Sequence, residues 1–313
     1  MQRRSWRPYV GGFLWIGVWL TSGHFLSKYA AHYQEGLVTT TRNFYGVLRV
    51  FDDDLGKPYA RRKLYHGRIN HGQQFLDPTK RDRPTSYFGT NSGVGIALRR
   101  HPTMQATRDG LSKAGMKVGV IGLGVGTIAS YARPHDEFTF YEINPEVERI
   151  AKRHFHFLSD APSKIKGVMG DGRISLEKEF EANGPRQFDL FAVDAFSGDA
   201  IPIHLLTKEA FELYFKHLKP EGILCLHISN RHINLRPVAR TLADHFGMRS
   251  ILIKNSSDRT DLIKSSSWIL VTTNEAFLNH ERVARSIRSW DDRDLEGILW
   301  TDDYSSLVEV LKH

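Results

Sequence analysis

Strand-like and helix-like segments alternate along the chain from residue 117 onward, and this alternation limits the fold more than any other feature of the sequence. Alternating strands and helices form a parallel sheet, because each helix crosses over before the next strand begins. We expect strands at 117–123, 137–143, 165–171, 188–196, 222–229 and 250–254, and helices at 145–157, 207–218 and 236–246. Segment 266–274 follows the sixth strand too closely for a crossover helix. It should therefore pair antiparallel and complete a seven-stranded mixed sheet.

The region before this alternation has a different pattern. Residues 36–76 mix β-branched and aromatic residues with polar ones, and three consecutive aspartates at 52–54 mark a turn. We expect a small antiparallel β-unit there, then a loop at 77–92 and a helix within 93–110. The chain is accordingly divided into an N-terminal segment, a β-unit and a main domain at residues 1–35, 36–92 and 93–313.

The charge of the chain is concentrated near its start. The formal net charge is +8, and the first 100 residues hold 16 Lys and Arg against 6 Asp and Glu. Because no nucleic-acid-binding signature accompanies this excess, we do not expect nucleic acid as a partner. A single cysteine, Cys225, excludes a disulfide framework and a multi-cysteine zinc site. Its presence fits a reducing compartment, and we expect a cytoplasmic protein.

The N-terminal segment combines basic residues with a short apolar run. Residues 9–20 are uncharged, and they are preceded by three basic residues, Arg3, Arg4 and Arg7. Twelve residues are few for a membrane span, which needs about 20. Three interpretations remain open: a short membrane anchor, an uncleaved signal-like segment, or a helix packed on the domain. The arginines fit an anionic membrane surface, so we expect association with the inner membrane surface through this segment.

A glycine-rich turn follows the first strand of the main domain. Gly122, Gly124 and Gly126 in GLGVGT permit a tight turn and a close approach to a ligand. The next strand ends in Glu142, 20 residues after Gly122, a spacing that suits a carboxylate binding ribose hydroxyls. Together these features predict a nucleoside site.

Acidic residues end the next two strands as well. Asp171 is followed by Gly172, and an acid there can accept a hydrogen bond from an adenine amino group. Asp194 ends the fourth strand. Each aspartate alone is equally typical of a helix N-cap. Three acids at the carboxyl ends of parallel strands suit a cationic sulfonium better than a pyrophosphate. The pattern predicts a Rossmann-like, class I S-adenosylmethionine-dependent methyltransferase fold.

Several segments, in order, resemble the spermidine synthase (polyamine aminopropyltransferase) family. They are FYGVLRV, LYHGRINHGQQ, GLGVGT, YEINP, GDGR, FDLFAVDAFSGDAIPIHLLT, HISNRHINLRPV and WTDDYSSL. They look most like a bacterial branch that is often joined to a transporter-like membrane region. The resemblance implies a transferase that moves an aminopropyl group from decarboxylated S-adenosylmethionine, or uses S-adenosylmethionine itself, with a small-molecule amine such as putrescine as acceptor. We also expect a homodimer.

The resemblance assigns roles to particular residues. The glycines of the turn and Glu142 match the donor site, and Asp171 with Gly172 matches the adenine side. Asp194 matches the proposed general base. Tyr87 matches a family tyrosine. Gln74 is our candidate for the donor's amino end.

The sequence also departs from the family pattern. The second aspartate of the acidic motif falls at Ser197, with Asp199 two residues later, and a family glutamate falls at Gly89. The aspartate–glycine pair of the β-unit appears as His66–Gly67 or His71–Gly72. Polyamines carry two or more positive charges, so the loss of acids weakens their site.

Other residues complete the candidate site. Asp199, Asp302 and Asp303 are candidates for replacing the lost acids, although a surface turn equally explains the last two. His227 is a candidate for the pocket wall or a core histidine. No histidine cluster has metal-ligand spacing, so we expect no metal, and no paired nucleophile and base is recognisable.

Three functions therefore remain open from the sequence. The first is aminopropyl transfer to an amine. The second is an S-adenosylmethionine-dependent methyltransferase or donor-cyclising enzyme. The third is a nucleoside-binding module without turnover. The departures from the acidic motif are what keep the second and third open.

Overall fold

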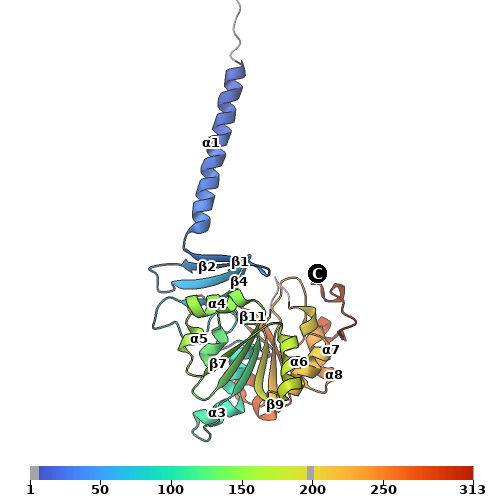
Figure 1. Cartoon of the computed structure of the whole chain (residues 1–313). Coiled ribbons are helices and arrows are strands. Elements are labelled where there is room, and N and C mark those ends of the chain that lie inside the picture. Colours follow the sequence, from blue (N-terminus) through green and yellow to red (C-terminus); the bar gives the residue numbers. More distant parts are fainter. Residues whose placement is uncertain (1–6, 196–200, 313) are drawn as a thin grey trace, which may run out of the picture.

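The computed structural model describes residues 7–195 and 201–312. Helix α1 (Arg7–Gln34) rises from one end of the molecule and points away from it (Figure 1). The large side chains whose placement is described along α1 are exposed, with Trp15 at 68% and Trp19 at 75%. The interpretation as a helix packed on the domain is therefore wrong. No helix within the described ranges combines the length and the apolar character that crossing a bilayer requires.

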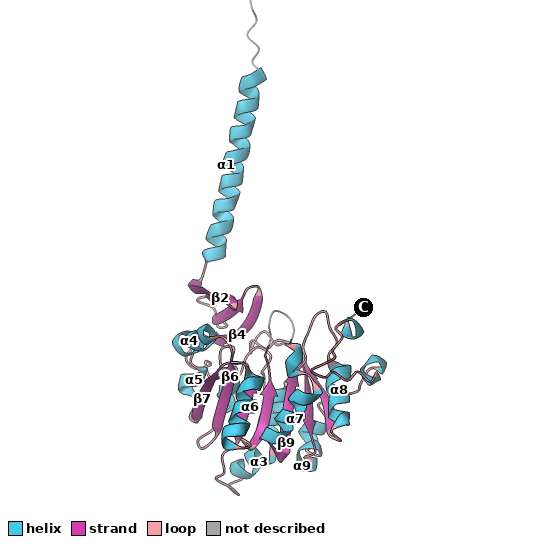
Figure 2. Ribbon diagram, turned by 45° about the vertical axis from the view of Figure 1, so that its right-hand side comes forward, coloured by secondary structure: helices cyan, strands magenta, loops and turns pink. Residues whose placement is uncertain are grey.

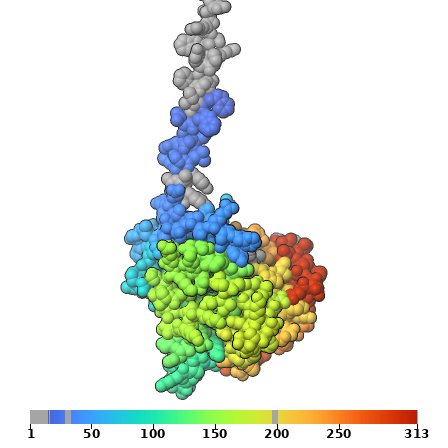
Figure 3. Space-filling view, viewed as in Figure 1, coloured from blue at the N-terminus to red at the C-terminus, as the bar shows by residue number. Residues whose placement is uncertain are grey.

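Next in the chain is a four-stranded antiparallel sheet. It consists of β1 (Leu37–Asn43), β2 (Gly46–Asp53), β3 (Arg61–His66) and β4 (Ile69–Phe75), in sequential order. The alternation of β-branched and polar residues thus correctly predicted a small antiparallel sheet. Leu48, Val50 and Leu64 are buried on one face, and the sheet lies over the end of the main domain from which α1 rises (Figure 3).

The main domain is built on a mixed sheet with the order β12-β10-β11-β9-β8-β5-β6-β7 (Figure 2). Its strands are β5 (Lys117–Ile121), β6 (Glu137–Glu142), β7 (Lys164–Met169), β8 (Phe188–Val193), β9 (Leu218–His227), β10 (Arg249–Asn255), β11 (Ser266–Thr272) and β12 (Ile287–Arg288). β5 to β9 pair in parallel, and β11 runs antiparallel between β9 and β10. The seven-stranded mixed sheet is confirmed. β12 is an addition of two residues, too short to leave a pattern in the sequence.

Helices cover both faces of this sheet (Figure 2). They are α2 (Gly93–Arg100), α3 (Pro102–Arg108), α4 (Pro145–His154), α5 (Phe157–Asp160), α6 (Gly172–Asn183), α7 (Lys208–His217), α8 (Arg236–His245), α9 (Glu275–Leu278) and α10 (Glu281–Ala284). Short 3-10 turns occur at η1 (Thr127–Tyr131), η2 (Ile203–Leu205), η3 (Asp292–Leu295) and η4 (Val308–Val310). The single helix expected within 93–110 is split at His101, because a residue before proline is disfavoured in helical conformation.

Two connections of the main domain contain elements for which no prediction was made. The glycine turn leads into the 3-10 turn η1. Helix α6, which follows Asp171, was not predicted, because its polar sequence buries only Gly172 and Leu176. The predicted helices at 145–157, 207–218 and 236–246 correspond to α4, α7 and α8.

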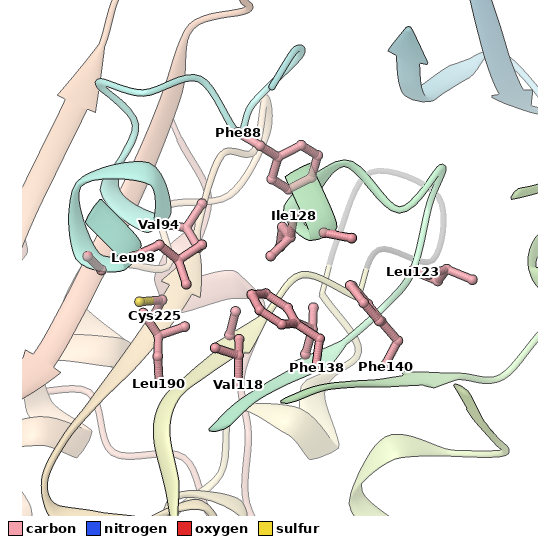
Figure 4. Close-up of a cluster of buried hydrophobic side chains, with 14 of the residues drawn as sticks. Phe88, Val94, Leu98, Val118, Leu123, Ile128, Phe138, Phe140, Leu190 and Cys225 are labelled. Atoms are coloured by element: carbon pink, nitrogen blue, oxygen red, sulfur yellow. The ribbon is translucent and has the colours of Figure 1, made fainter. Parts of the chain in front are cut away.

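The core has two parts, one on each face of the sheet, because successive strand residues point to opposite faces. One part contains Val118, Phe138 and Leu190 with helix α2 and the free thiol of Cys225 (Figure 4). The other packs α7 and α8 against residues such as Phe191. Both parts fix the strand ends at which the candidate site lies.

Candidate active site

A cavity of about 340 Å³ opens where the carboxyl ends of β5, β6, β8 and β9 meet the N-terminal sheet. This volume is within the range of small-molecule sites. Most of the predicted site residues line it: Tyr87, Gly122, Gly124, Glu142, Asp171, Gly172, Asp194 and His227. Open α/β sheets bind ligands at this edge of the sheet.

The glycine turn lines the cavity through Gly122 and Gly124. Neither position tolerates a side chain. Gly122 has φ +98°, and a Cβ atom there would collide with the backbone oxygen of Asp194. Gly124 has φ +54°, and a Cβ atom would lie 2.7 Å from the backbone oxygen of His71 in β4. Both are therefore required to be glycine, for backbone conformation and for close approach. Gly124 is thus one of the places where the N-terminal sheet contacts the main domain.

Glu142 ends β6 with its carboxylate fixed by backbone amides. The N–H of Leu123 donates to Oε2 at 3.0 Å, and the N–H of Asn144 donates to Oε1 at 2.8 Å. Burial raises the pKa of Glu142, while these backbone hydrogen bonds oppose the rise. Each carboxylate oxygen has a further lone pair, so the group can still accept hydroxyl hydrogens from a ligand.

Asp171 is both a helix N-cap and a cavity residue. Its Oδ1 accepts the N–H of Ile174 at 3.0 Å, and its Oδ2 lies 2.9 Å from Nε2 of His204. The N-cap interpretation is therefore confirmed, and a role at the adenine stays a prediction. Gly172 begins α6 beside it and also lines the cavity.

Asp194 follows β8 and lies against His227 at the end of β9. Oδ1 of Asp194 is 2.5 Å from Nδ1 of His227, and Nε2 of His227 is 2.9 Å from Oγ of Ser229. Burial raises the pKa of Asp194, and the neighbouring His227 opposes the rise. The side chain of Asp194 retains 15% exposure toward the cavity. The contact between Asp194 and His227 was not predicted, because it forms only where the adjacent parallel strands β8 and β9 bring the two side chains together.

Aromatic rings flank this pair of groups. The His227 ring stacks on Trp268 with centroids 4.5 Å apart and planes at 9°. The half-buried Tyr87 ring lies 5.1 Å from the His227 ring. Nζ of Lys264 lies 5.1 Å from the centre of the Tyr87 ring, and burial together with nearby Lys63 lowers the pKa of Lys264 to about 8. Lys264 was not predicted, because nothing in its local sequence marks its surroundings.

Gln74 and Gly126 lie outside the cavity, which corrects both assignments. Nε2 of Gln74 donates to the backbone oxygen of Arg81 at 2.8 Å, and its Oε1 accepts the N–H of His156 at 2.9 Å. Its amide is thus used to join β4 to neighbouring loops. Gly126 faces the side chain of Leu158.

The C-terminal acids also lie away from the cavity lining. Asp302 pairs with Arg173 at 2.6 Å and accepts the hydroxyl hydrogen of Thr207 at 2.8 Å. Asp303 is exposed on the surface. These positions correct the prediction of a substrate role for both. Asp199 lies outside the described residues, as does Ser197.

Histidines form the opposite wall, and sequence reasoning did not assign them. His66 and His71 line the cavity from the N-terminal sheet. Asn70 pairs with Tyr65 and Gly72 pairs with Leu64, so the register between β3 and β4 shifts by one residue. His71 is the extra residue of β4 at this shift. Such a bulge redirects side chains. Burial, with smaller contributions from His66 and Lys264, lowers the pKa of His71 to about 4.

Within residues 7–195 and 201–312, no three or more His, Cys, Asp or Glu side chains are grouped so as to hold a metal ion.

No family model matches the sequence. Two curated relatives are similar to parts of it. An N-terminal histidine N-methyltransferase from Emericella nidulans is 31% identical over 60% of this chain and 32% of the relative. A polyamine aminopropyltransferase from Vibrio vulnificus is 32% identical over 34% of this chain and 35% of the relative. The matches thus span about a third of the length of each relative, and both relatives are transferases.

Solved structures share the fold over most of the chain. A probable spermidine synthase from Corynebacterium glutamicum has a TM-score of 0.60 at 17% identity, covering 86% of this chain and 98% of that one. A spermidine synthase in complex with the transition-state analogue AdoDATO has a TM-score of 0.54 at 16% identity, covering 85% and 82%. The Rossmann-like methyltransferase fold with a small N-terminal antiparallel sheet is confirmed. The comparisons support a likeness to spermidine synthases. Within residues 7–195 and 201–312, no helix could be a span of the transporter-like membrane region that the resemblance suggested.

Proposed function

We propose that the chain is a spermidine synthase-like transferase, which moves an aminopropyl group from decarboxylated S-adenosylmethionine to an amine such as putrescine. The observation that carries this proposal is the position of Asp194. Its carboxylate faces the cavity beside the glycine turn and is held by His227. A carboxylate so placed can bind an ammonium group and take its proton.

The donor would lie across the acidic rim at the strand ends. Glu142 would accept the ribose hydroxyl hydrogens, and Asp171 the adenine amino hydrogen, while the backbone at Gly122 and Gly124 approaches the nucleoside closely. The acidic rim would also favour a positively charged sulfonium. A spermidine synthase with this fold was solved with the transition-state analogue AdoDATO.

The reaction needs little covalent assistance from the protein. An amine acceptor is protonated near neutral pH and cannot attack until Asp194 accepts a proton from it. The sulfonium is already a good leaving group, so alignment of nitrogen, carbon and sulfur supplies most of the remaining acceleration. Tyr87, beside His227, is placed to align the acceptor.

The direct test is turnover by the purified full chain with decarboxylated S-adenosylmethionine and a panel of amines, followed by mass spectrometry. We expect an aminopropylated amine and a thioether product, both lost in Asp194→Asn. Asp303→Asn, which removes an exposed acid outside the cavity, is the control and should retain activity. Formation of product by Asp194→Asn at the wild-type rate would contradict the assigned base.

A second candidate is methyl transfer or donor cyclisation with intact S-adenosylmethionine. It is favoured by His66 and His71, which both line the cavity, because the resemblance places a family aspartate at one or the other of these positions. Methylated product, or donor breakdown without an acceptor, would identify it in the same assay. If neither donor bound in calorimetry, both enzymatic functions would fail; binding without turnover would instead identify a nucleoside-binding module.

We also propose that α1 binds an anionic membrane surface. Trp15, Trp19 and Phe25 are exposed along it, and tryptophan is favoured at membrane interfaces. Removal of residues 1–30 should reduce co-sedimentation with anionic liposomes while donor affinity is unchanged. A truncated chain that still sediments would contradict this. Homodimer formation stays a prediction, which light scattering of the purified chain would test.

A further inference from the structure

A continuous line of hydrogen bonds ends on Asp194. The backbone N–H of Ser267 in β11 donates to Oγ of Ser229 at 2.8 Å. Oγ of Ser229 lies 2.9 Å from Nε2 of His227, and Nδ1 of His227 lies 2.5 Å from Oδ1 of Asp194. The line therefore crosses from β11 through the end of β9 to the end of β8.

The carboxylate at the end of this line sets the direction of the other bonds. A carboxylate can only accept, so Nδ1 of His227 carries a proton and donates it to Asp194. A neutral imidazole with its proton on Nδ1 accepts at Nε2. The hydroxyl of Ser229, whose oxygen accepts the N–H of Ser267, is then the donor to Nε2. Every donor thus faces the carboxylate.

The imidazole plane is held by packing. The ring stacks on the fully buried Trp268, with planes at 9°. Nε1 of Trp268 in turn donates to Oγ of Ser266 at 3.1 Å and to the backbone oxygen of Tyr87 at 3.3 Å. Rotation of His227 away from Asp194 would therefore break both the stacking and the hydrogen bonds.

From this geometry we propose that His227 and Ser229 are positioning residues that hold Asp194 as the base, with its second oxygen turned to the acceptor. The proposal rests on the proposed function. Within the described part of the chain no hydrogen bond occupies Oδ2 of Asp194.

The acceptor ammonium gives a proton to Oδ2. Its nitrogen then bonds to the donor carbon, the carbon–sulfur bond breaks, and the electron pair stays on sulfur as a thioether. His227 keeps its Nδ1 proton throughout, and Asp194 later releases the acceptor proton to solvent.

The effect on pH dependence follows from the same contacts. His227 opposes the rise that burial causes in the pKa of Asp194, so without His227 the base would need a higher pH to ionise. Among the described residues, the other titratable groups that line the cavity are Glu142 and Asp171 on the rim, His204 beside them, Tyr141 in β6, Tyr45, His66 and His71 on the N-terminal sheet, and Tyr87, with Lys264 over its ring. These groups are unchanged in the variants described next. A difference in pH profile between the variants therefore reports on His227 and Asp194.

Three variants of the full chain test the proposal. His227→Phe keeps a ring against Trp268 but has no donor, and its kcat should fall about 100-fold, the scale of one acid–base contribution. Its donor KM should stay within about twofold of wild type, and the acid limb of its pH profile should move to higher pH. His227→Asn offers an amide N–H near the position of Nδ1 and should recover most of the rate. Ser229→Ala should give a smaller loss with the same shift. Equal losses in the Phe and Asn variants, or an unmoved acid limb, would overturn the proposal.

A second measurement does not depend on turnover. In the ¹⁵N-labelled full chain, we expect NMR to show His227 as the Nδ1-protonated tautomer, and Ser229→Ala to mix the tautomers. An Nε2-protonated His227 in wild type would overturn the direction of the line.

Covalent labelling of Ser229 by a fluorophosphonate would also overturn the proposal, because Ser229 would then be an activated nucleophile. If no donor and amine react while the Nδ1 tautomer is observed, the proposed function fails and the hydrogen-bond line stands.

Discussion

The two walls of the cavity differ in charge. The rim at the strand ends carries Glu142, Asp171 and Asp194, whereas the N-terminal sheet contributes His66 and His71. The rim positions are set by a parallel sheet that the chain shares with spermidine synthases of low identity. The carboxylates therefore lie on the rim and the histidines on the N-terminal sheet, so substitutions on the two walls test different properties of the cavity.

The largest effect is expected where the two walls touch. Gly124→Val would press a side chain against the backbone oxygen of His71, 2.7 Å from the Cβ position. Strain of about 3 kcal/mol at such a position corresponds to about a 100-fold loss of donor affinity. Calorimetry with S-adenosylmethionine measures it. Gly110→Val is the matched control, because Gly110 also has a positive φ, +73°, but nothing within 4 Å of its Cβ position. Equal donor affinity in both variants would show that the walls do not meet at Gly124.

The histidine wall should make folding sensitive to acid. The folded-state pKa of His71 is lowered to about 4 from its usual 6.5. The unfolded chain therefore binds more protons between these values, and stability is lost as pH falls from 6.5 toward 4. The loss attributable to His71 is at most about 3 kcal/mol. Urea unfolding at pH 7.5 and 5 should show a smaller loss for His71→Asn than for wild type.

His232→Asn, which changes an exposed histidine, is the control for this measurement. If wild type and His71→Asn lost the same stability between pH 7.5 and 5, His71 would not be held neutral by burial.

On the rim, Glu142→Gln tests donor recognition. The backbone N–H groups of Leu123 and Asn144 both point at the carboxylate, so a side-chain amide would place an NH₂ against one of them. Loss of one such charged hydrogen bond reduces affinity by about 10-fold. Binding of S-adenosylmethionine should show this, with Glu181→Gln, at an exposed position of α6 outside the cavity lining, as the control. Unchanged affinity in Glu142→Gln would remove Glu142 from the donor site.

The sequence predicted the rim better than the histidine wall for a physical reason. Strand ends follow from local patterns, so Glu142, Asp171 and Asp194 could be placed together before the structure was known. His71 reaches the cavity through a bulge in β4, and no local pattern marks it. Gln74, three residues further along that strand, was consequently assigned to the wrong surroundings.

The fold itself shows the same limit. The order of patterned strands and helices was predictable, whereas β12, with two residues, and the polar helix α6 were not. Lys264 and His204 reach the site only through tertiary packing, so their local sequences carry no signal. The pairing of His227 with Asp194 likewise depends on β8 and β9 being neighbours.

The smallest effect is expected at Asp302, which tests whether acidic recognition extends beyond the rim. Asp302 bonds to Arg173 and Thr207, and its side chain is 40% exposed. The hydrogen-bonded ion pair with Arg173 lowers the pKa of Asp302. Solvent screening limits the contribution of such an exposed pair to the free energy of unfolding to less than about 1 kcal/mol. Asp302→Asn should therefore lower the free energy of unfolding slightly in urea titration and leave the KM for the amine unchanged. A several-fold rise in that KM would return Asp302 to the acceptor site and make the acidic region larger than the three strand-end carboxylates.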